Sequence, residues 1–152
     1  MIDCLAVTDI TIAKLASEDR AAWGHLFRGY LDFYETSRDD AALTHTWEAF
    51  ARDDVMHALG AKVDGRLVGI AHFLTHASTT AADVCYLQDL FTAPEARGRG
   101  VARTLIDAVS DAARARGCSR VYWLTHESNA TARRLYDRVA TDSGFIRYQI
   151  AL

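Results

Sequence analysis

Apolar side chains recur at steps of three and four over the first third of the chain, which is the spacing of an amphipathic helix. The pattern predicts a helix over about 18–34, with Ser17 as its cap and acids in its first turn. Its inward face consists of Trp23, Leu26, Phe27, Tyr30, Leu31 and Tyr34. A second, shorter helix over about 43–51 turns Trp47 and Phe50 inward. We interpret the aromatic residues of both helices as core.

Alternating apolar positions predict the first strands. Ile10 and Ile12 begin one strand, and 56–63 and 66–74 form two more. The dipeptide Asp64-Gly65 between them permits the positive φ angles that a two-residue hairpin turn needs. These two strands are therefore expected to be antiparallel.

The second half of the chain predicts a crossover. Strands are expected at 84–91 and 120–125, joined by a helix that Gly117 ends. A strand–helix–strand connection of this kind normally makes its two strands parallel. A last helix over 129–139 and an alternating terminal strand over 145–152 follow.

A basic, glycine-rich segment, Arg97-Gly98-Arg99-Gly100-Val101-Ala102, joins the strand at 84–91 to the crossover helix. The buried stripe of that helix is read from Ala102, Leu105, Ile106, Val109, Ala112 and Ala113. A helix N-terminus carries about half a positive charge and unpaired N–H groups, and glycines let a diphosphate approach the backbone closely. Arg103 adds positive charge beside it. We therefore expect an anionic, phosphate-bearing ligand at this turn.

The same turn has three other interpretations. A basic glycine turn that only starts a helix is the plain alternative. A dinucleotide-binding turn is disfavoured, because Arg103 stands where that fingerprint has its third glycine. A Walker loop is excluded, because Lys14 and Lys62 are the lysines of the chain and neither adjoins a glycine-rich turn.

Composition and charge narrow the class of protein. The 152 residues are 50% apolar and 24% charged, which is typical of one globular domain spanning 1–152. The net charge of −3 combines an arginine-rich second part with an acidic first part. The acids are Asp32, Glu35, Asp39, Asp40, Glu48, Asp53 and Asp54. The acidic part suits a cationic amine, although a solvated face is the plain reading, and the arginines form no long stripe of the kind that binds nucleic acid.

The chain is also expected to be a soluble, cytoplasmic protein. Its apolar runs fall short of the about 18 residues that a membrane span needs, and its N-terminus does not read as a secretory leader. Cys4, Cys85 and Cys118 are odd in number and lack Cys-x-x-Cys spacing, which favours reduced thiols. His72 and His76 are four residues apart on a strand that runs into a loop, so no metal is expected there.

Two separate segments resemble the GNAT N-acetyltransferases. Arg97, Gly100 and Ala102 match the Arg/Gln-x-x-Gly-x-Gly/Ala loop with which that family binds acetyl-CoA. The run from Val121-Tyr122-Trp123 through Asn129 and Leu135-Tyr136 to Gly144-Phe145 is similar to the end of the family's core, and to small fungal acetyltransferases associated with histone tails or D-amino acids. The run Tyr86-Leu87-Gln88-Asp89-Leu90-Phe91 resembles spermidine/spermine acetyltransferases.

The resemblance implies an α/β (α+β) fold and a reaction. The fold has a mixed, mostly antiparallel central sheet of six to seven strands, flanked by about four helices. The reaction moves an acetyl group from acetyl-CoA, a cosubstrate, to an amine by direct attack in a ternary complex. The sequence agrees in offering no Gly-x-Ser-x-Gly nucleophile. The residues implied for cosubstrate binding are Leu90, Phe91, Thr92, Arg97, Gly98, Arg99, Gly100, Val101, Ala102 and Asn129.

Family position makes Tyr136 the candidate general acid, with packing in its helix as the alternative role. A water relay, helped by Asp89 or His126, is expected to take the proton of the amine. The polyamine branch carries Glu where Gln88 stands here, and an amide takes no proton. Asp89 would point to the opposite face of a regular strand, so reaching the same pocket would need a bulge.

The acceptor is expected to be a small-molecule amine. A protein lysine or N-terminal amine, and a CoA-binding domain without turnover, stay open as alternatives. No metal, nucleic acid or membrane partner is expected. A homodimer or larger assembly is common in the resembling families, and the terminal strand at 145–152 is a candidate for its interface.

Overall fold

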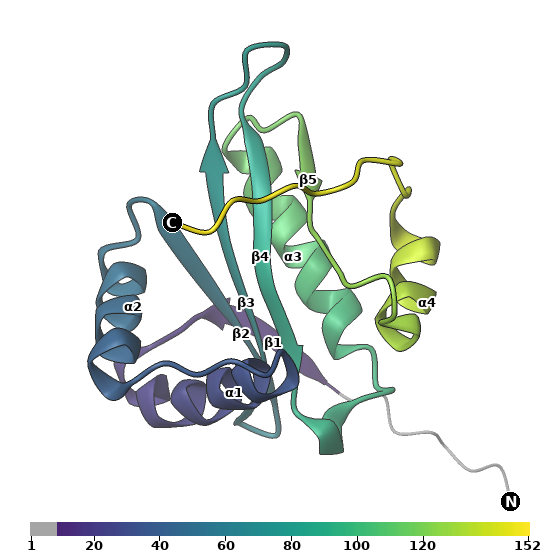
Figure 1. Cartoon of the computed structure of the whole chain (residues 1–152). Coiled ribbons are helices and arrows are strands. Elements are labelled where there is room, and N and C mark those ends of the chain that lie inside the picture. The colour runs from purple at the N-terminus through teal and green to yellow at the C-terminus, as the bar shows by residue number, and fades with distance from the viewer. Residues whose placement is uncertain (1–8) are drawn as a thin grey trace, which may run out of the picture.

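The computed structural model describes residues 9–152, and most of its elements lie where the hydrophobic pattern predicts them (Figure 1). The strands are β1 (Ile10–Lys14), β2 (Met56–Val63), β3 (Arg66–His76), β4 (Val84–Thr92) and β5 (Arg120–Tyr122). The helices are α1 (Arg20–Phe33), α2 (Asp40–Arg52), α3 (Val101–Ala115) and α4 (Ala130–Val139), with 3₁₀ turns at Ser17–Asp19 and Pro94–Ala96. Cys4 lies outside the described residues.

The strands form one mixed sheet in the order β1-β2-β3-β4-β5. The first three neighbouring pairs are antiparallel, and β4 and β5 are parallel. This confirms the hairpin at Asp64-Gly65 and the crossover through α3. Helices α1 and α2 cover one face of the sheet, and α3 covers the other (Figure 1).

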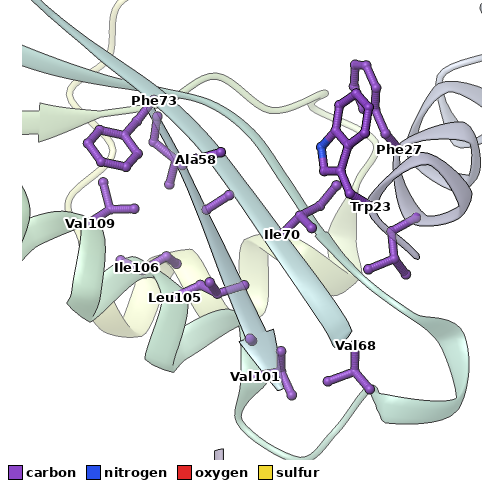
Figure 2. Packing of buried hydrophobic residues seen from close by; sticks show 14 of the residues in the cluster. Trp23, Phe27, Ala58, Val68, Ile70, Phe73, Val101, Leu105, Ile106 and Val109 are labelled. Atoms are coloured by element: carbon purple, nitrogen blue, oxygen red, sulfur yellow. The ribbon is translucent and has the colours of Figure 1, made fainter. Parts of the chain in front are cut away.

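The core fills both faces of the sheet. Figure 2 shows Val109 of α3 next to Phe73 on one side of the sheet and Trp23 and Phe27 of α1 on the other. Gly69 of β3 lets α3 approach closely, because a Cβ there would lie 2.7 Å from the Cγ1 atom of Val101. The N-terminus of α3 is thereby fixed against the sheet.

The predicted terminal strand is wrong for the described structure. Residues 140–152 form neither helix nor strand, and Phe145, Ile146, Tyr148 and Ile150 are strongly exposed. The described sheet therefore has five strands rather than six to seven. The physical reason is that a strand needs a partner, and β5, with three residues, offers too short an edge for an eight-residue neighbour.

Two boundary predictions also need correction. The strand expected at 120–125 ends at Tyr122, and the chain then bends towards α4 (Figure 1). Ser17 does not cap α1: its hydroxyl lies 3.3 Å from a carboxylate oxygen of Glu18, and a 3₁₀ turn precedes the helix. Asp39 caps α2 through the amide of Ala42, so that helix begins earlier than its apolar pattern indicates.

Candidate active site

The edge of β4 that faces β5 is only partly used. Strand β5 pairs with residues Val84 to Tyr86 and then ends. Beyond Tyr86, β4 pairs with β3 alone among the described residues, so its other edge is open where Leu90, Phe91 and Thr92 lie. An open edge presents N–H and C=O groups that a linear ligand with amides can pair with, as an added strand would. The three predicted cosubstrate contacts therefore share one accessible backbone edge.

The open edge leads to the N-terminus of α3. Gly98 and Gly100 have φ angles of 75° and 85°, and the space that a Cβ would take is empty at both. Asp39 and Asn129 cap α2 and α4 with their side chains, whereas Gly100 begins α3 without a side-chain cap from any described residue. The first amides of α3 are thus available to an anion.

The side chains around this turn differ in what they can contribute. Arg97 donates from Nε to the carbonyl oxygen of Thr92 at 3.1 Å and lies over the ring of Phe91, which leaves the other guanidinium N–H groups for an anion. Val101 is buried, so only its backbone reaches the turn. Arg103 pairs with Asp107 along the helix.

A small pocket lies beside the open edge of β4. Its lining residues are Tyr30, Tyr34, Leu87, Gln88, Leu90, Trp123, Leu124 and Tyr136. The cavity volume is about 20 Å³, enough for one water-sized group. The ring of Tyr136 meets that of Trp123 edge-on, with centroids 5.3 Å apart. Burial and the nearby Tyr34 raise the pKa of Tyr136 to about 12, so the phenol keeps its proton at neutral pH.

The interpretation of Tyr30 and Tyr34 as core residues is incomplete, because these two rings also border the pocket. Both line the pocket, and Tyr34 is 39% exposed. Burial and the neighbouring Asp89 carboxylate raise the pKa of both phenols. The available signal was the choice of tyrosine at two positions one helical turn apart, because a buried aromatic with a hydroxyl needs a polar partner.

Asp89 lies at a bulge. The β3–β4 register pairs His72 with Asp89 but Phe73 with Leu87, which leaves Gln88 as an extra residue on β4. Cross-strand partners share a face, so Asp89 lies on the face of His72. Its Oδ2 atom is 2.9 Å from Nδ1 of His72, and it also hydrogen-bonds with Tyr30. The bulge that the sequence argument required is therefore present, but Asp89 itself does not line the pocket and meets it through Tyr30.

The remaining predicted site residues are less close to the pocket. His126 is exposed, and the described pocket lining does not include it. Asn129 caps α4, since its Oδ1 atom accepts from the amide of Ala132 at 3.3 Å and its Nδ2 atom donates to Thr125 Oγ1 at 3.4 Å. Its contact with the cosubstrate stays a prediction.

None of the seven acids of the first part lines this described pocket. Asp40 pairs with Arg28, and Asp53 pairs with Lys14 and His57, so these carboxylates serve surface and structural contacts. Asp89 does not line the pocket either, but its carboxylate interacts with Tyr30, which does.

The described cysteines and histidines do not form a nucleophilic or metal site. Cys85 and Cys118 are free thiols, and burial raises the pKa of Cys85 to about 11 and that of Cys118 above its usual value. Over residues 9–152, no three histidine, cysteine, aspartate or glutamate side chains gather as a metal site would require. Over the same residues, no helix has the length and apolar character to cross a bilayer.

Known proteins match this chain in both sequence and structure. The model of the acetyltransferase (GNAT) family matches residues 21–140. D-amino-acid N-acetyltransferase HPA3 of Saccharomyces cerevisiae is 32% identical over 145 residues, which cover 92% of this chain and 89% of that protein. Ribosomal-protein-alanine N-acetyltransferase from Brucella melitensis biovar Abortus 2308 superposes with a TM-score of 0.77 at 27% identity, over 95% of this chain and 100% of that one.

A third similarity concerns the fold alone. The structure of AAC(6')-Iy in complex with the bisubstrate analogue CoA-S-monomethyl-acetylneamine superposes with a TM-score of 0.85 at 19% identity. It covers 95% of this chain and 99% of that chain. The likeness shows that this chain shares the arrangement of sheet and helices of that structure.

Proposed function

The chain belongs to the acetyltransferase (GNAT) family, and from this premise we propose that it acetylates the primary amine of a small molecule by direct attack within a ternary complex. It is an N-acetyltransferase, and acetyl-CoA is the cosubstrate that the family and its CoA complexes imply. One observation carries the proposal: an open strand edge runs into an uncapped helix N-terminus beside a pocket that contains a protonated tyrosine.

Acetyl-CoA fits this arrangement part by part. The amides of its pantetheine arm suit the open backbone at Leu90, Phe91 and Thr92. Its diphosphate suits the first amides of α3, where Gly98 and Gly100 leave space for a close approach. Arg97 adds charge-assisted donors next to that position. The thioester then lies towards the pocket.

Tyr136 is the proposed general acid. Its pKa, raised to about 12 by burial, keeps the phenol protonated, so it can donate to the CoA thiolate as the C–S bond breaks. Its edge-on contact with Trp123 restricts the ring where Tyr136 lines the pocket. This supports a catalytic role beyond packing.

Asp89 is the preferred of the two proposed proton acceptors. An alkylammonium with a pKa near 10.4 costs roughly 4 to 5 kcal/mol to deprotonate at pH 7, so the amine needs a base or a water relay. Neither residue lines the described pocket, but Asp89 hydrogen-bonds with Tyr30 of the pocket wall, whereas His126 is exposed and has no such link. A carboxylate next to aromatic rings also attracts the cationic form of the acceptor.

The size of the pocket supports a small-molecule acceptor. A cavity of about 20 Å³ has room for an ammonium head, which is the group that a small amine presents. The yeast relative is named for D-amino acids, which are small amines, and we transfer that class to this chain. The name of the Brucella protein points to a protein amine, which keeps the alternative worth testing.

We also propose that the chain assembles as a homodimer in the cytoplasm. Residues 145–152 expose Phe145, Ile146, Tyr148 and Ile150, and an apolar surface of this kind is better covered by a second copy than by water. The molar mass in solution, measured by light scattering, tests this assembly, and a monomer at micromolar concentration would rule it out.

The decisive experiment is an acceptor panel with acetyl-CoA, followed by mass spectrometry of the products. Alkylamines, amino acids of both hands, and peptides with free lysines or N-termini are compared. Turnover of small amines is expected, and exclusive turnover of peptides would overturn the proposed substrate class. Tyr136→Phe should lower turnover by roughly a hundredfold or more with CoA affinity unchanged, because proton transfer typically contributes about 10²–10⁴.

Tyr122→Phe is the matched control for that variant. Tyr122 also carries a phenol near the sheet edge, where it contacts His76, but it does not line the described pocket. Its loss should leave turnover near that of the parent. Equal rates for Tyr136→Phe and the parent would remove Tyr136 from the mechanism.

A further inference from the structure

Asp89 ends a chain of buried polar groups, and the other members of this chain, Trp23 and His72, have no part in the reaction proposed above. His72, in the middle of β3, is 1% exposed. Aromatic rings surround it, with centroids 6.0 Å away for Trp23, 5.1 Å for Phe27 and 4.5 Å for Phe50. An imidazole is costly to bury among apolar rings unless both of its nitrogens are hydrogen-bonded.

Both nitrogens of His72 have partners, and these partners fix its tautomer. The indole Nε1 of Trp23 lies 2.9 Å from Nε2 of His72, and an indole N–H is a donor only. Nε2 is therefore the acceptor, and the proton of the neutral ring resides on Nδ1. That N–H donates to Oδ2 of Asp89, 2.9 Å away. The hydrogen bonds run in one direction, from Trp23 through His72 to Asp89.

The bulge at Gln88 makes this contact possible. In a regular strand Asp89 would share a face with Leu87, two residues earlier. Because the register shifts between His72 and Phe73, Asp89 pairs with His72 and lies on the face that α1 and α2 cover. The sheet thereby places a carboxylate under the aromatic residues of α1.

Asp89 retains capacity for a ligand. Its side chain is 12% exposed, and its recorded partners within the described residues are His72 and Tyr30, both neutral donors. The other titratable groups that feel its charge are Tyr34 of α1 and Tyr86 of β4. A carboxylate has about four acceptor positions, so two remain for an incoming ammonium.

We propose that His72 is a positioning residue, which holds the Asp89 carboxylate against Tyr30 of the pocket wall so that it binds the ammonium of the acceptor and takes its first proton. Trp23 fixes the tautomer that makes this possible. The inference rests on the proposed N-acetyltransferase function and identifies the preferred acceptor as a cationic primary amine.

The protons balance in this scheme. The ammonium gives one proton to Asp89, which passes it to water, and the freed nitrogen lone pair attacks the thioester carbonyl carbon. The C–N bond forms, the C–S bond breaks, and the thiolate takes the phenol proton of Tyr136. The nitrogen then loses its second proton, which restores Tyr136. The products are the amide, the CoA thiol and one proton in solvent.

His72→Leu tests the proposal, with His57→Leu as the matched control. His57 is also a buried histidine beside an aspartate, Asp53, but it lies outside the described pocket. Both variants lose a histidine–aspartate hydrogen bond, so both should melt earlier. His72→Asn keeps an N–H donor near the position of Nδ1 and serves as the conservative rescue.

The readouts are kcat/KM for the amine, its pH profile and the dissociation constant for CoA. His72→Leu should lower kcat/KM by roughly tenfold to a hundredfold, the size of losing a hydrogen bond to a charged group. The acid limb should move to higher pH, because the anionic form of Asp89 loses a donor. CoA affinity should not change, His57→Leu should leave the acid limb in place, and His72→Asn should recover part of the loss.

Several results would overturn the role of His72. One is an acid limb of the kcat/KM profile that does not move in His72→Leu. Another is an acid limb that moves equally far in His57→Leu. If His72→Leu does not fold, Trp23→Phe keeps an aromatic ring while removing the indole N–H, and an acid limb unmoved in that variant would equally overturn the proposal. Parent turnover on the amine panel is measured first, because its absence would refute the proposed function itself.

Discussion

Substitution of Gly100 should affect both the stability of the free protein and its affinity for CoA, and the two effects can be measured separately. Gly100 has a φ angle of 85°, and a Cβ built on it meets no atom within 4 Å. The penalty for any other residue in the free protein is therefore conformational and amounts to about 1–2 kcal/mol for the left-handed region. For a chain of this size that corresponds to a loss of roughly 2–8 °C in Tm. Bound diphosphate adds a second, separate penalty.

Gly100→Glu brings a carboxylate to the place proposed for the diphosphate. Two like charges about 4 Å apart repel by about 4 kcal/mol at an effective dielectric constant of about 20, which is roughly a thousandfold in affinity. Salt and solvent exposure reduce this, so we expect CoA to bind roughly a hundredfold to a thousandfold more weakly. Gly100→Gln has nearly the same size without the charge and should lose clearly less affinity.

Isothermal titration with CoA at low and high salt is the assay. The difference between the glutamate and glutamine variants should shrink at about 1 M salt, where the Debye length is about 3 Å. Gly65→Ala is the control for backbone strain, because Gly65 has a φ angle of 75° in equally open space but lies in the β2–β3 hairpin. It should lower Tm similarly and leave CoA affinity intact. If Gly100→Glu binds CoA within about threefold of the parent, the diphosphate does not lie at this turn.

Two further predictions concern stability. Lys62→Met should destabilise the protein by about 1–3 kcal/mol in urea unfolding, because it leaves the buried carboxylate of Asp19 without the ammonium 2.8 Å away. Lys14→Met breaks a more exposed pair with Asp53 and should cost at most about 1 kcal/mol. Equal losses in the two variants would contradict this prediction. Hydrogen bonds from His57 and Lys14 lower the pKa of Asp53. Burial raises the pKa of Asp19, but hydrogen bonds from Lys62 and the Ala16 amide outweigh this effect and lower it. The stability that both carboxylates contribute is therefore present above about pH 4 and is lost as the pH falls through their lowered pKa values. Tm measured from pH 7 to 3 should fall below pH 4, and Lys62→Met should flatten that fall; an unchanged slope would contradict the assignment.

Local patterns predicted the parts of this molecule that depend on short stretches of chain. The β2–β3 hairpin has its expected turn because Asp64-Gly65 determines it locally. The buried stripe of α3 follows from helical spacing, and the loop at 97–102 from glycine chemistry. The strand predicted at 145–152 was wrong, because an alternating pattern indicates the two faces of a strand but not whether a neighbouring strand has a free edge to pair with it.

The bulge at Gln88 marks the limit of the sequence argument within the site. The hydrophobic pattern of β4 correctly predicts a strand, but the position of Asp89 depends on how β4 pairs with β3. That register involves His72, 17 residues earlier, and no local signal records it. The sequence could therefore state that a bulge was required but not that one exists.

Helix α1 explains why core and site could not be separated by periodicity. Trp23 and Tyr30 are seven residues apart, which is two helical turns, so both belong to one apolar stripe. Trp23 lies over the middle of the sheet and is fully buried, whereas Tyr30 reaches the region where β4 loses its β5 neighbour. The same helical face thus supplies the indole that holds His72 and the phenol that contacts Asp89. What distinguishes a core ring from a site ring here is the sheet beneath it, which the spacing of apolar residues does not encode.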